Sequence, residues 1–238
     1  MKKLNILLLF VVFTGMLYAG DTLFFKVSLL GLHCANVEVI EDQIDDNVTE
    51  IIYHAYTVGG FHNIYKIDNW YYYYADAAMS HLDSLKKDIT NRNMKQFYRE
   101  DISDGMIRYS GSHVLTTPEP VHHILSALVY LQHYPEHIQT GYRFPFLITD
   151  EGDLYRTEIS VSLNEKKAQK DVTFGFEHVA GKEILEPTDV FNWMICAGKG
   201  ARTLSYSLED HRITEGAFSL GWGLNLRAKR VYRDKSKK

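Results

Sequence analysis

The chain has 238 residues and a mass of 27.5 kDa, and 45% of its residues are hydrophobic, 24% charged and 13% aromatic. These proportions are typical of a folded globular protein and exclude a disordered or fibrous chain. The formal net charge of −4 argues against a general nucleic-acid-binding protein, which needs a basic surface to displace counterions from phosphates.

Residues 1–19 predict a secretory signal peptide. Two lysines after Met1 precede an apolar run from Ile6 to Leu17, which suits a signal peptide and is too short for a transmembrane helix. Ala19 offers a small residue for cleavage, although Leu17 is bulkier than usual two positions earlier. An uncleaved membrane anchor is therefore the alternative. We expect an exported chain, periplasmic or otherwise outside the cytoplasm, that starts near residue 20.

Charge is distributed unevenly along the exported chain. Loss of Lys2 and Lys3 leaves 24 basic residues against 30 acidic ones, a net charge of −6. Basic residues nevertheless crowd the C-terminal end, and residues 233–238 predict a basic tail. The tail is expected to be solvated, with peripheral contact to anionic lipid headgroups as the alternative.

Alternation of apolar and polar residues predicts β-strands through most of residues 20–232. The turn sequences at 103–105 and 151–153 combine Gly with Asp, as β-hairpins do, so antiparallel pairing is expected. The expected strands cover 23–29, 35–39, 50–58, 67–74, 83–90, 94–102, 106–110, 143–149, 154–163, 171–179, 202–208 and 217–230.

One segment, 121–132, repeats apolar residues at helical spacing. Thr117 is its expected cap, and Pro135 is expected to end it. An amphipathic helix of this kind most naturally covers one face of a sheet. Without a low-complexity linker or repeat, residues 20–232 are expected to form a single domain.

Several strands carry apolar residues on both faces, notably 51–56 and 70–74. We therefore predict a mainly β fold: a curved, half-barrel-like antiparallel sheet with one covering α-helix. Its concave face would meet the helix or line a groove. A closed sandwich packed on both faces is the alternative, and an outer-membrane barrel is disfavoured because the helix interrupts it.

The run from Trp70 to Tyr74 is the most informative aromatic feature. Aromatic rings with hydroxyl tips suit a groove for a lipid, a glycan or a partner strand, and cross-strand packing in a β core is the alternative. The candidate groove residues are Trp70, Tyr72, Tyr74, Leu125, Leu128 and Trp222.

Two cysteines and eleven histidines raise the question of other chemistry. Export permits a disulfide between Cys34 and Cys196, with two separate buried thiols as the alternative. No catalytic residue, metal site or cofactor is predicted, because no Gly-x-Ser-x-Gly motif is present and no Cys or acidic ligand accompanies the densest histidines at a recognisable spacing. Those histidines are His122, His123, His133 and His137.

Short motifs along residues 21–232 resemble a bacterial exported family, domain of unknown function 3108. The resemblance is carried by 25–32, by 65–69 with Asp76, by 125–131 and by 209–213. The sequence departs from the family pattern at Ala35, Gln132 and Thr214, where the family favours Gly, Arg and Pro. The resemblance implies an exported β-rich domain and, by analogy, the half-barrel of lipoprotein carriers; it implies no reaction.

These features predict a non-enzymatic envelope protein that binds a lipid or other amphipathic ligand in a sheet groove. Two alternatives stay open at this point. One is a protein-interaction module that acts through a sheet edge or an aromatic patch and has an envelope protein as its partner. The other is a metal-dependent hydrolase, which only the histidine group motivates.

Overall fold

The computed structural model describes residues 21–92, 94–111, 113–117, 119–182, 202–221 and 224–232. Within these residues, fifteen strands form one continuous sheet in the order β8-β7-β6-β5-β4-β3-β2-β1-β15-β14-β13-β12-β11-β10-β9. All neighbours are antiparallel except β9 and β10, which are parallel. The predicted signal peptide, the predicted basic tail, Cys196 and Trp222 lie outside the described residues.

The first half of the chain forms one wing of the sheet. Its strands are β1 (Asp21–Leu29), β2 (Leu32–Gln43), β3 (Val48–Thr57), β4 (Ile67–Asp76), β5 (Leu82–Asn91), β6 (Met94–Ser103), β7 (Met106–Tyr109) and β8 (Val114–Thr116). A short helix, α2 (Gly59–Ile64), joins β3 to β4.

The second half begins with the main helix and completes the sheet. Its strands are β9 (Val121–His123), β10 (Leu147–Asp150), β11 (Asp153–Asn164), β12 (Gln169–Gly181), β13 (Arg202–Ser207), β14 (Ile213–Gly221) and β15 (Leu224–Val231). Helix α3 (Ile124–His133) follows β9, and the 3₁₀ turns are η1 (Pro135–His137) and η2 (Glu165–Lys167).

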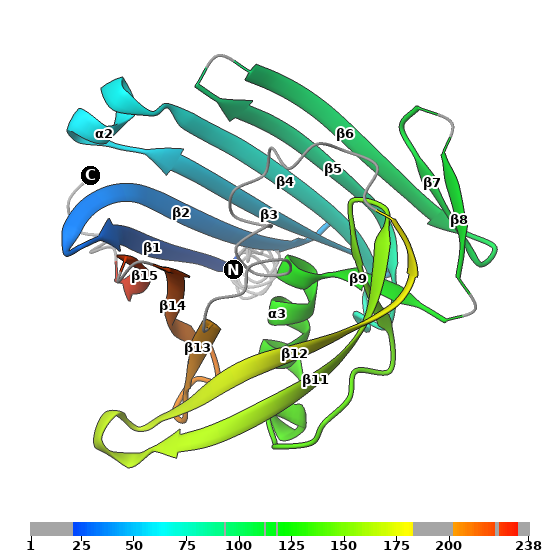
Figure 1. Ribbon diagram of the computed structural model, residues 1–238. Helices are drawn as coiled ribbons and strands as arrows, with labels where there is room; N and C mark the ends of the chain where they lie inside the picture. The colour runs from blue at the N-terminus through cyan, green and yellow to red at the C-terminus, as the bar shows by residue number, and fades with distance from the viewer. Residues whose placement is uncertain are drawn as a thin grey trace, which may run out of the picture.

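The sheet curls around α3, as Figure 1 shows. Strand β9, at one end of the strand order, contacts β5 in the other wing, so the sheet rolls almost into a barrel with the helix inside. The predicted fold class is confirmed: a mainly β, curved sheet with one helix on its concave face. The sandwich alternative is wrong, because all described strands belong to one sheet. No helix in the described ranges is long and apolar enough to span a membrane.

Helix α3 begins three residues later than the sequence predicts. Val121–His123 are extended and pair with Leu147–Thr149 of β10. His123 caps the helix instead of Thr117: its side chain accepts a hydrogen bond from Leu125 N, while the Ser126 hydroxyl accepts one from His123 N. This reciprocal arrangement is a capping box. The predicted end is confirmed, since α3 stops at His133, before Pro135.

The strand expected over 217–230 is in fact two strands. Gly221 of β14 pairs with Leu224 of β15, and the two strands are antiparallel neighbours in the sheet. The predicted hairpin turns at 103–105 and 151–153 are confirmed. Asp104 and Gly105 both have positive φ, as do Glu151 and Gly152, which is the backbone that two-residue hairpin turns require.

Candidate functional site

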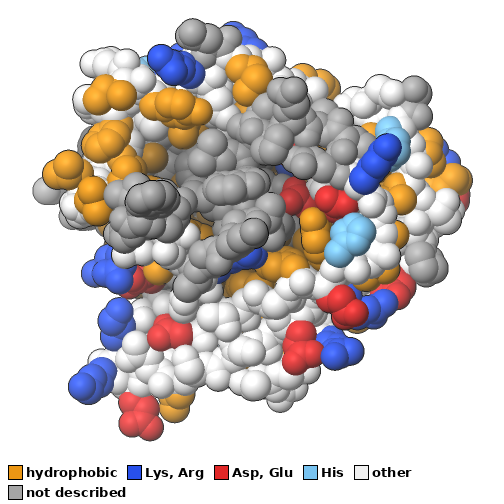
Figure 2. All heavy atoms as spheres, in the orientation of Figure 1, with side chains coloured by type: hydrophobic (Ala, Val, Ile, Leu, Met, Phe, Trp, Pro, Cys, Tyr) orange, Lys and Arg blue, Asp and Glu red, His pale blue; other side chains and the backbone are white. Residues whose placement is uncertain are grey.

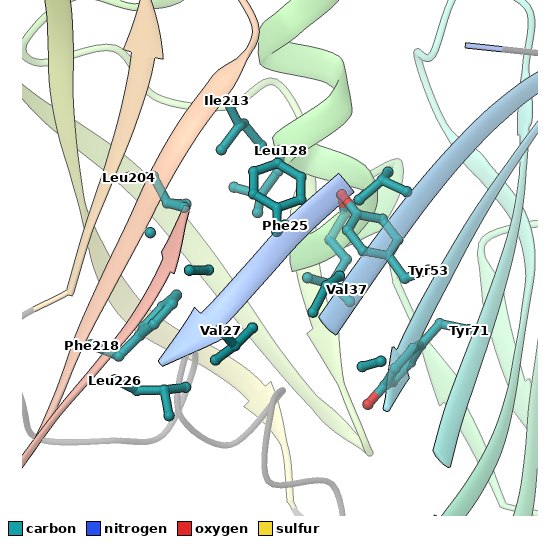
Figure 3. A pocket seen from close by; sticks show the side chains of 15 residues that line it. Phe25, Val27, Val37, Tyr53, Tyr71, Leu128, Leu204, Ile213, Phe218 and Leu226 are labelled. Atoms are coloured by element: carbon teal, nitrogen blue, oxygen red, sulfur yellow. The ribbon is translucent and has the colours of Figure 1, made fainter. Parts of the chain in front are cut away.

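An apolar pocket lies between α3 and the concave face of the sheet. Its volume is about 100 Å³, and it is only partly enclosed. Figure 3 shows its side chains, which come from the helix and from strands on both sides of β1. The residues that line it are Phe25, Val27, Val37, Val39, Tyr53, Ala55, Tyr71, Leu125, Leu128, Leu204, Ile213, Gly216, Phe218, Leu226 and Ala228. None of these side chains is charged.

Hydrogen bonds from the sheet hold α3 in place above the pocket. The Tyr53 hydroxyl donates to Leu125 O at 2.9 Å, and the Tyr206 hydroxyl donates to Leu128 O at 3.4 Å. Burial raises the pKa of both phenols well above the usual range, so both remain neutral donors. At the end of the helix, His133 Nε2 lies 2.5 Å from Glu41 Oε1, and this hydrogen bond raises the pKa of His133.

The polar tips of the pocket tyrosines are therefore already used. Tyr53 is bonded to the helix, and the Tyr71 hydroxyl accepts a hydrogen bond from Asn69 Nδ2 at 3.2 Å. The two rings present their apolar surfaces to the pocket, so its lining offers shape and hydrophobicity and no charged group.

Gly216 helps to keep the pocket open. A Cβ atom at this position would lie 3.2 Å from Leu204 Cδ2 and 3.2 Å from Phe218 Cε2. These contacts are tighter than ordinary van der Waals packing, so any side chain at residue 216 would displace one of these two neighbours. The absence of a side chain lets Phe218 lie flat along its own strand.

Two of the predicted groove residues, Leu125 and Leu128, line the pocket. The structure separates three others from it: Trp70, Tyr72 and Tyr74 lie half-exposed on the outer face of β4. Inward positions of that strand are held instead by Tyr71 and Tyr73, which are almost completely buried. Trp222, the sixth residue, lies outside the described ranges.

Two of the three outward aromatics, Trp70 and Tyr74, pack across strands, on the outer face and not in the core that the sequence alternative named. The rings of His54 and Trp70 stack with their centroids 3.7 Å apart, and Trp70 and Tyr72 are 6.1 Å apart in parallel planes. Lys86 Nζ lies 5.0 Å from the centre of the Tyr74 ring. This outer ladder therefore stabilises the pairing of β3, β4 and β5.

The sequence does not predict the pocket tyrosines Tyr53 and Tyr71, because both faces of their strands carry apolar or aromatic residues and either face could point inward. One signal was available. Asp68 and Asp76 lie an even number of residues from Trp70 and therefore on the same face of β4. A carboxylate at each end of the strand marks that face as the outer one.

The four densest histidines have separate structural roles. His122 is buried against Phe146, and burial lowers its pKa to about 4. His123 Nδ1 lies 2.9 Å from the Tyr73 hydroxyl, His133 pairs with Glu41, and His137 Nδ1 lies 2.9 Å from the Tyr130 hydroxyl. Across the described part of the chain, no group of three or more His, Cys, Asp or Glu residues could hold a metal ion.

Cys34, one partner of the predicted disulfide, is buried and has no disulfide partner among the described residues. Its Sγ donates a weak hydrogen bond to Val27 O at 3.5 Å, and burial raises its pKa. Since Cys196 falls outside the described residues, the pairing of the two cysteines stays a prediction.

A second feature inside the barrel is a buried cluster of charged side chains. Lys87 Nζ lies 3.0 Å from Glu151 Oε1, and both groups are almost inaccessible to water. Nearby, the Tyr98 hydroxyl donates to Glu100 Oε1 at 2.6 Å, and Thr149 Oγ1 donates to Glu100 Oε2 at 3.4 Å. None of these residues lines the apolar pocket, so the cluster is a structural element that joins β5 and β6 to β10.

The fold defines a class of barrel-like proteins in which an open sheet surrounds one helix. One solved structure is similar in fold: a beta-barrel-like protein of domain of unknown function DUF1849 from Brucella abortus. The two chains superpose with a TM-score of 0.54 and 9% sequence identity, over 90% of this chain and 96% of that chain. At this identity the likeness shows the fold alone.

Neither a family model nor a curated protein sequence matches the chain. Membership of the family of domain of unknown function 3108 therefore stays a proposal.

Proposed function

We propose that this chain is a non-enzymatic, exported binding protein that holds an acyl chain or a similarly slender apolar group between α3 and the sheet. The observation that carries the proposal is the uncharged lining of the pocket, in which the hydroxyls of Tyr53 and Tyr71 are already hydrogen-bonded inside the protein. A catalytic site needs titratable or nucleophilic groups around the substrate, and the titratable groups of this lining are Tyr53 and Tyr71, whose hydroxyls are bonded within the protein. An apolar lining instead favours burial of hydrocarbon, at roughly 0.8 kcal/mol per CH₂ group.

The size of the pocket limits what fits. An apolar cavity of roughly 150 Å³ takes up one benzene-sized molecule, so a space of about 100 Å³ accepts a short hydrocarbon segment. Because the pocket is only partly enclosed, the remainder of an amphipathic molecule would lie outside it. This geometry favours a lipid tail over a compact, polar metabolite.

Filling the pocket should abolish binding. Ala228 of β15 lines the pocket, and Ala228→Trp would place an indole where the hydrocarbon lies. We expect this variant to bind the fluorescent apolar probe N-phenyl-1-naphthylamine at least about 10-fold more weakly than the unaltered chain, since the lost burial exceeds about 1.4 kcal/mol. Fluorescence titration measures the effect.

Ala217→Trp is the matched control. Ala217 is also half-buried and lies on the neighbouring strand β14, next to Gly216 and hence on the opposite face. The Ala217→Trp variant should bind the probe as the unaltered chain does. Circular dichroism should show that both tryptophan variants fold. Equal binding by the two tryptophan variants would contradict the proposal.

A direct test needs no probe. Solvent extraction of the purified protein followed by mass spectrometry should release a lipid, and adding that lipid back should raise the melting temperature. An extract without lipid, together with no lipid-dependent rise in melting temperature, would count against the proposed function.

A further inference from the structure

Exposed apolar side chains gather in the turns at one end of strands β1 to β6. Leu30 and Leu32, at the β1–β2 turn, are 67% and 64% exposed, and Ile64, at the end of α2, is 75% exposed. Tyr65 follows Ile64, and Met94 begins β6 at the same edge. We call these five residues the apolar edge. Figure 2 shows hydrophobic side chains gathered on the side of the molecule where α2 and the β1–β2 turn lie.

The turn that carries the two leucines has the regular geometry of a β-hairpin turn. Leu30 and Gly31 both have positive φ, at 51° and 82°, which is the backbone of a two-residue hairpin turn. Helix α2 is tied to the same hairpin, because Val58 N donates to Cys34 O at 3.0 Å and Phe61 packs on the cluster around Val27. The protein thus holds large apolar side chains in water on an ordered scaffold, and such exposure often marks an interaction site.

The charges around the apolar edge are all of one sign. Segments 27–37, 57–67 and 89–96, which supply the turns of this edge, contain no Asp or Glu. They contain Lys66, Arg92 and Lys95, which are exposed and for which the described residues provide no ion-pair partner. Arg92 N donates to Lys66 O at 2.6 Å, so two of these cations lie side by side, just before β4 begins and just after β5 ends.

The opposite ends of the same strands are acidic. Their turns and strand ends carry Asp42, Asp45, Asp46, Asp76, Asp83, Asp101 and Asp104. This wing of an acidic protein therefore has a positive, apolar edge and a negative edge. An anionic surface would attract the first and repel the second, which fixes an orientation.

The apolar edge is also continuous with the pocket. Val27, Cys34 and Ala35 form the small buried cluster beneath α2, and Val37, Leu226 and Ala228 pack against it. Four of these residues (Val27, Val37, Leu226 and Ala228) line the pocket as well. Apolar packing thus extends from Phe61 of α2, the helix that ends at Ile64, to the interior.

We propose that the apolar edge docks on an anionic phospholipid bilayer. Leu30, Leu32 and Ile64 would enter the boundary between headgroups and acyl chains, while Lys66, Arg92 and Lys95 pair with lipid phosphates. Combined apolar insertion and electrostatic attraction is what holds proteins at membrane interfaces. This inference goes beyond the proposed function, because the edge would dock whether or not the pocket takes a ligand.

Vesicle sedimentation tests the inference. The protein is purified after export from the cell, and mass spectrometry determines its N-terminus. We expect binding to vesicles of phosphatidylcholine with 30% phosphatidylglycerol. The double variant Leu30→Asn/Leu32→Ser should bind at least about 10-fold more weakly, because two leucines no longer enter the lipid. Asn tolerates the positive φ of residue 30.

The matched control is Leu163→Asn/Leu208→Ser, which removes two leucines, 58% and 40% exposed, far from this edge. It should bind as the unaltered chain does. A charge variant, Lys66→Gln/Lys95→Gln, should lose roughly 25-fold on these vesicles, at about 5-fold for each cation, and little on pure phosphatidylcholine.

Three results would overturn the inference: no binding by the unaltered chain, equal losses in the edge and control variants, or equal losses of the charge variant on both kinds of vesicle. If the edge leucines instead control self-association in analytical ultracentrifugation without affecting vesicle binding, the edge joins copies of the chain and the inference is also wrong. The pocket variant Ala228→Trp should keep vesicle binding, so a failed pocket and a failed edge give different patterns.

Discussion

Replacing Lys87 with methionine should lower the free energy of unfolding by about 3–5 kcal/mol, because it leaves buried carboxylates without their cation. The Lys87 side chain is 1% exposed, and its Nζ lies 3.0 Å from Glu151 Oε1. The same ammonium lies 5.6 Å from the centre of the Tyr98 ring and lowers the pKa of Glu100. Methionine fills a similar volume, so charge rather than packing is what the substitution removes. Urea denaturation at pH 8 measures the effect.

Lys86→Met provides the control on the adjacent residue. Lys86 points outward, where its Nζ lies over the Tyr74 ring, and its loss should cost no more than about 1 kcal/mol. Adding Glu151→Gln to Lys87→Met should recover part of the loss, because one unpaired buried charge is then absent. If Lys86→Met and Lys87→Met cost the same, the buried pair does not stabilise the fold in this way.

Local patterns in the sequence predict the strands well, because alternation and turn chemistry are properties of neighbouring residues. The turns at 103–105 and 151–153 require positive φ, and the Gly in each predicts them. The helix over 121–132 is also predicted, but not its first turn. Val121–His123 are extended because they pair with β10, and nothing near them in the sequence indicates a strand that lies more than twenty residues further along the chain.

The pocket is harder to predict than the strands, because it depends on which face of each strand points inward. A shift of one residue in β4 exchanges Trp70 and Tyr72 for Tyr71 and Tyr73. The aromatic run makes both faces look alike, and only the paired strands and α3 decide between them. Leu125 and Leu128 lie at the pocket because a helix has one apolar stripe that must meet the sheet.

Long-range pairing explains why the buried pair of Lys87 and Glu151 could not be predicted in full. Parity places Lys87 on the same face as Leu85 and Ile89, which are both buried, so a buried lysine could have been predicted. Its partner could not, because Glu151 is 64 residues away and belongs to the other wing. The closure of the sheet, which brings β9 to β5, creates this environment, and no local pattern encodes it.

Glu100 should make a large contribution to the pH dependence of stability, opposite in sign to that of His122, whose pKa burial lowers to about 4. This side chain is completely buried, and burial raises the pKa of its carboxyl to about 7, against the lowering effects of the Tyr98 hydrogen bond and the Lys87 charge. The folded state therefore holds a proton that the unfolded state releases above about pH 4.5. The stabilisation is fully present below pH 4.5 and is lost as the pH rises through about 7, with a total loss on the order of 3 kcal/mol.

Glu100→Gln should remove this contribution, because the amide keeps an acceptor for the Tyr98 hydroxyl and does not titrate. We expect the variant to be more stable than the unaltered chain by on the order of 2–3 kcal/mol at pH 8 and to differ little from it at pH 4.5. Urea denaturation between pH 4.5 and pH 8 measures this difference in the free energy of unfolding. Asp101→Asn, at an exposed carboxylate paired with Arg99, is the control and should not alter the slope. Parallel curves for the unaltered chain and Glu100→Gln would refute the assignment.

The two substitutions should also interact in a direction that the structure fixes. The Lys87 ammonium favours the ionised form of Glu100, so its removal should raise the pKa of Glu100 above 7. In the Lys87→Met background, the pH at which stability falls should therefore move upward. Adding Glu100→Gln to that background should restore more stability at pH 8 than Glu100→Gln adds to the unaltered chain, because it then removes a buried carboxylate that has lost its cation.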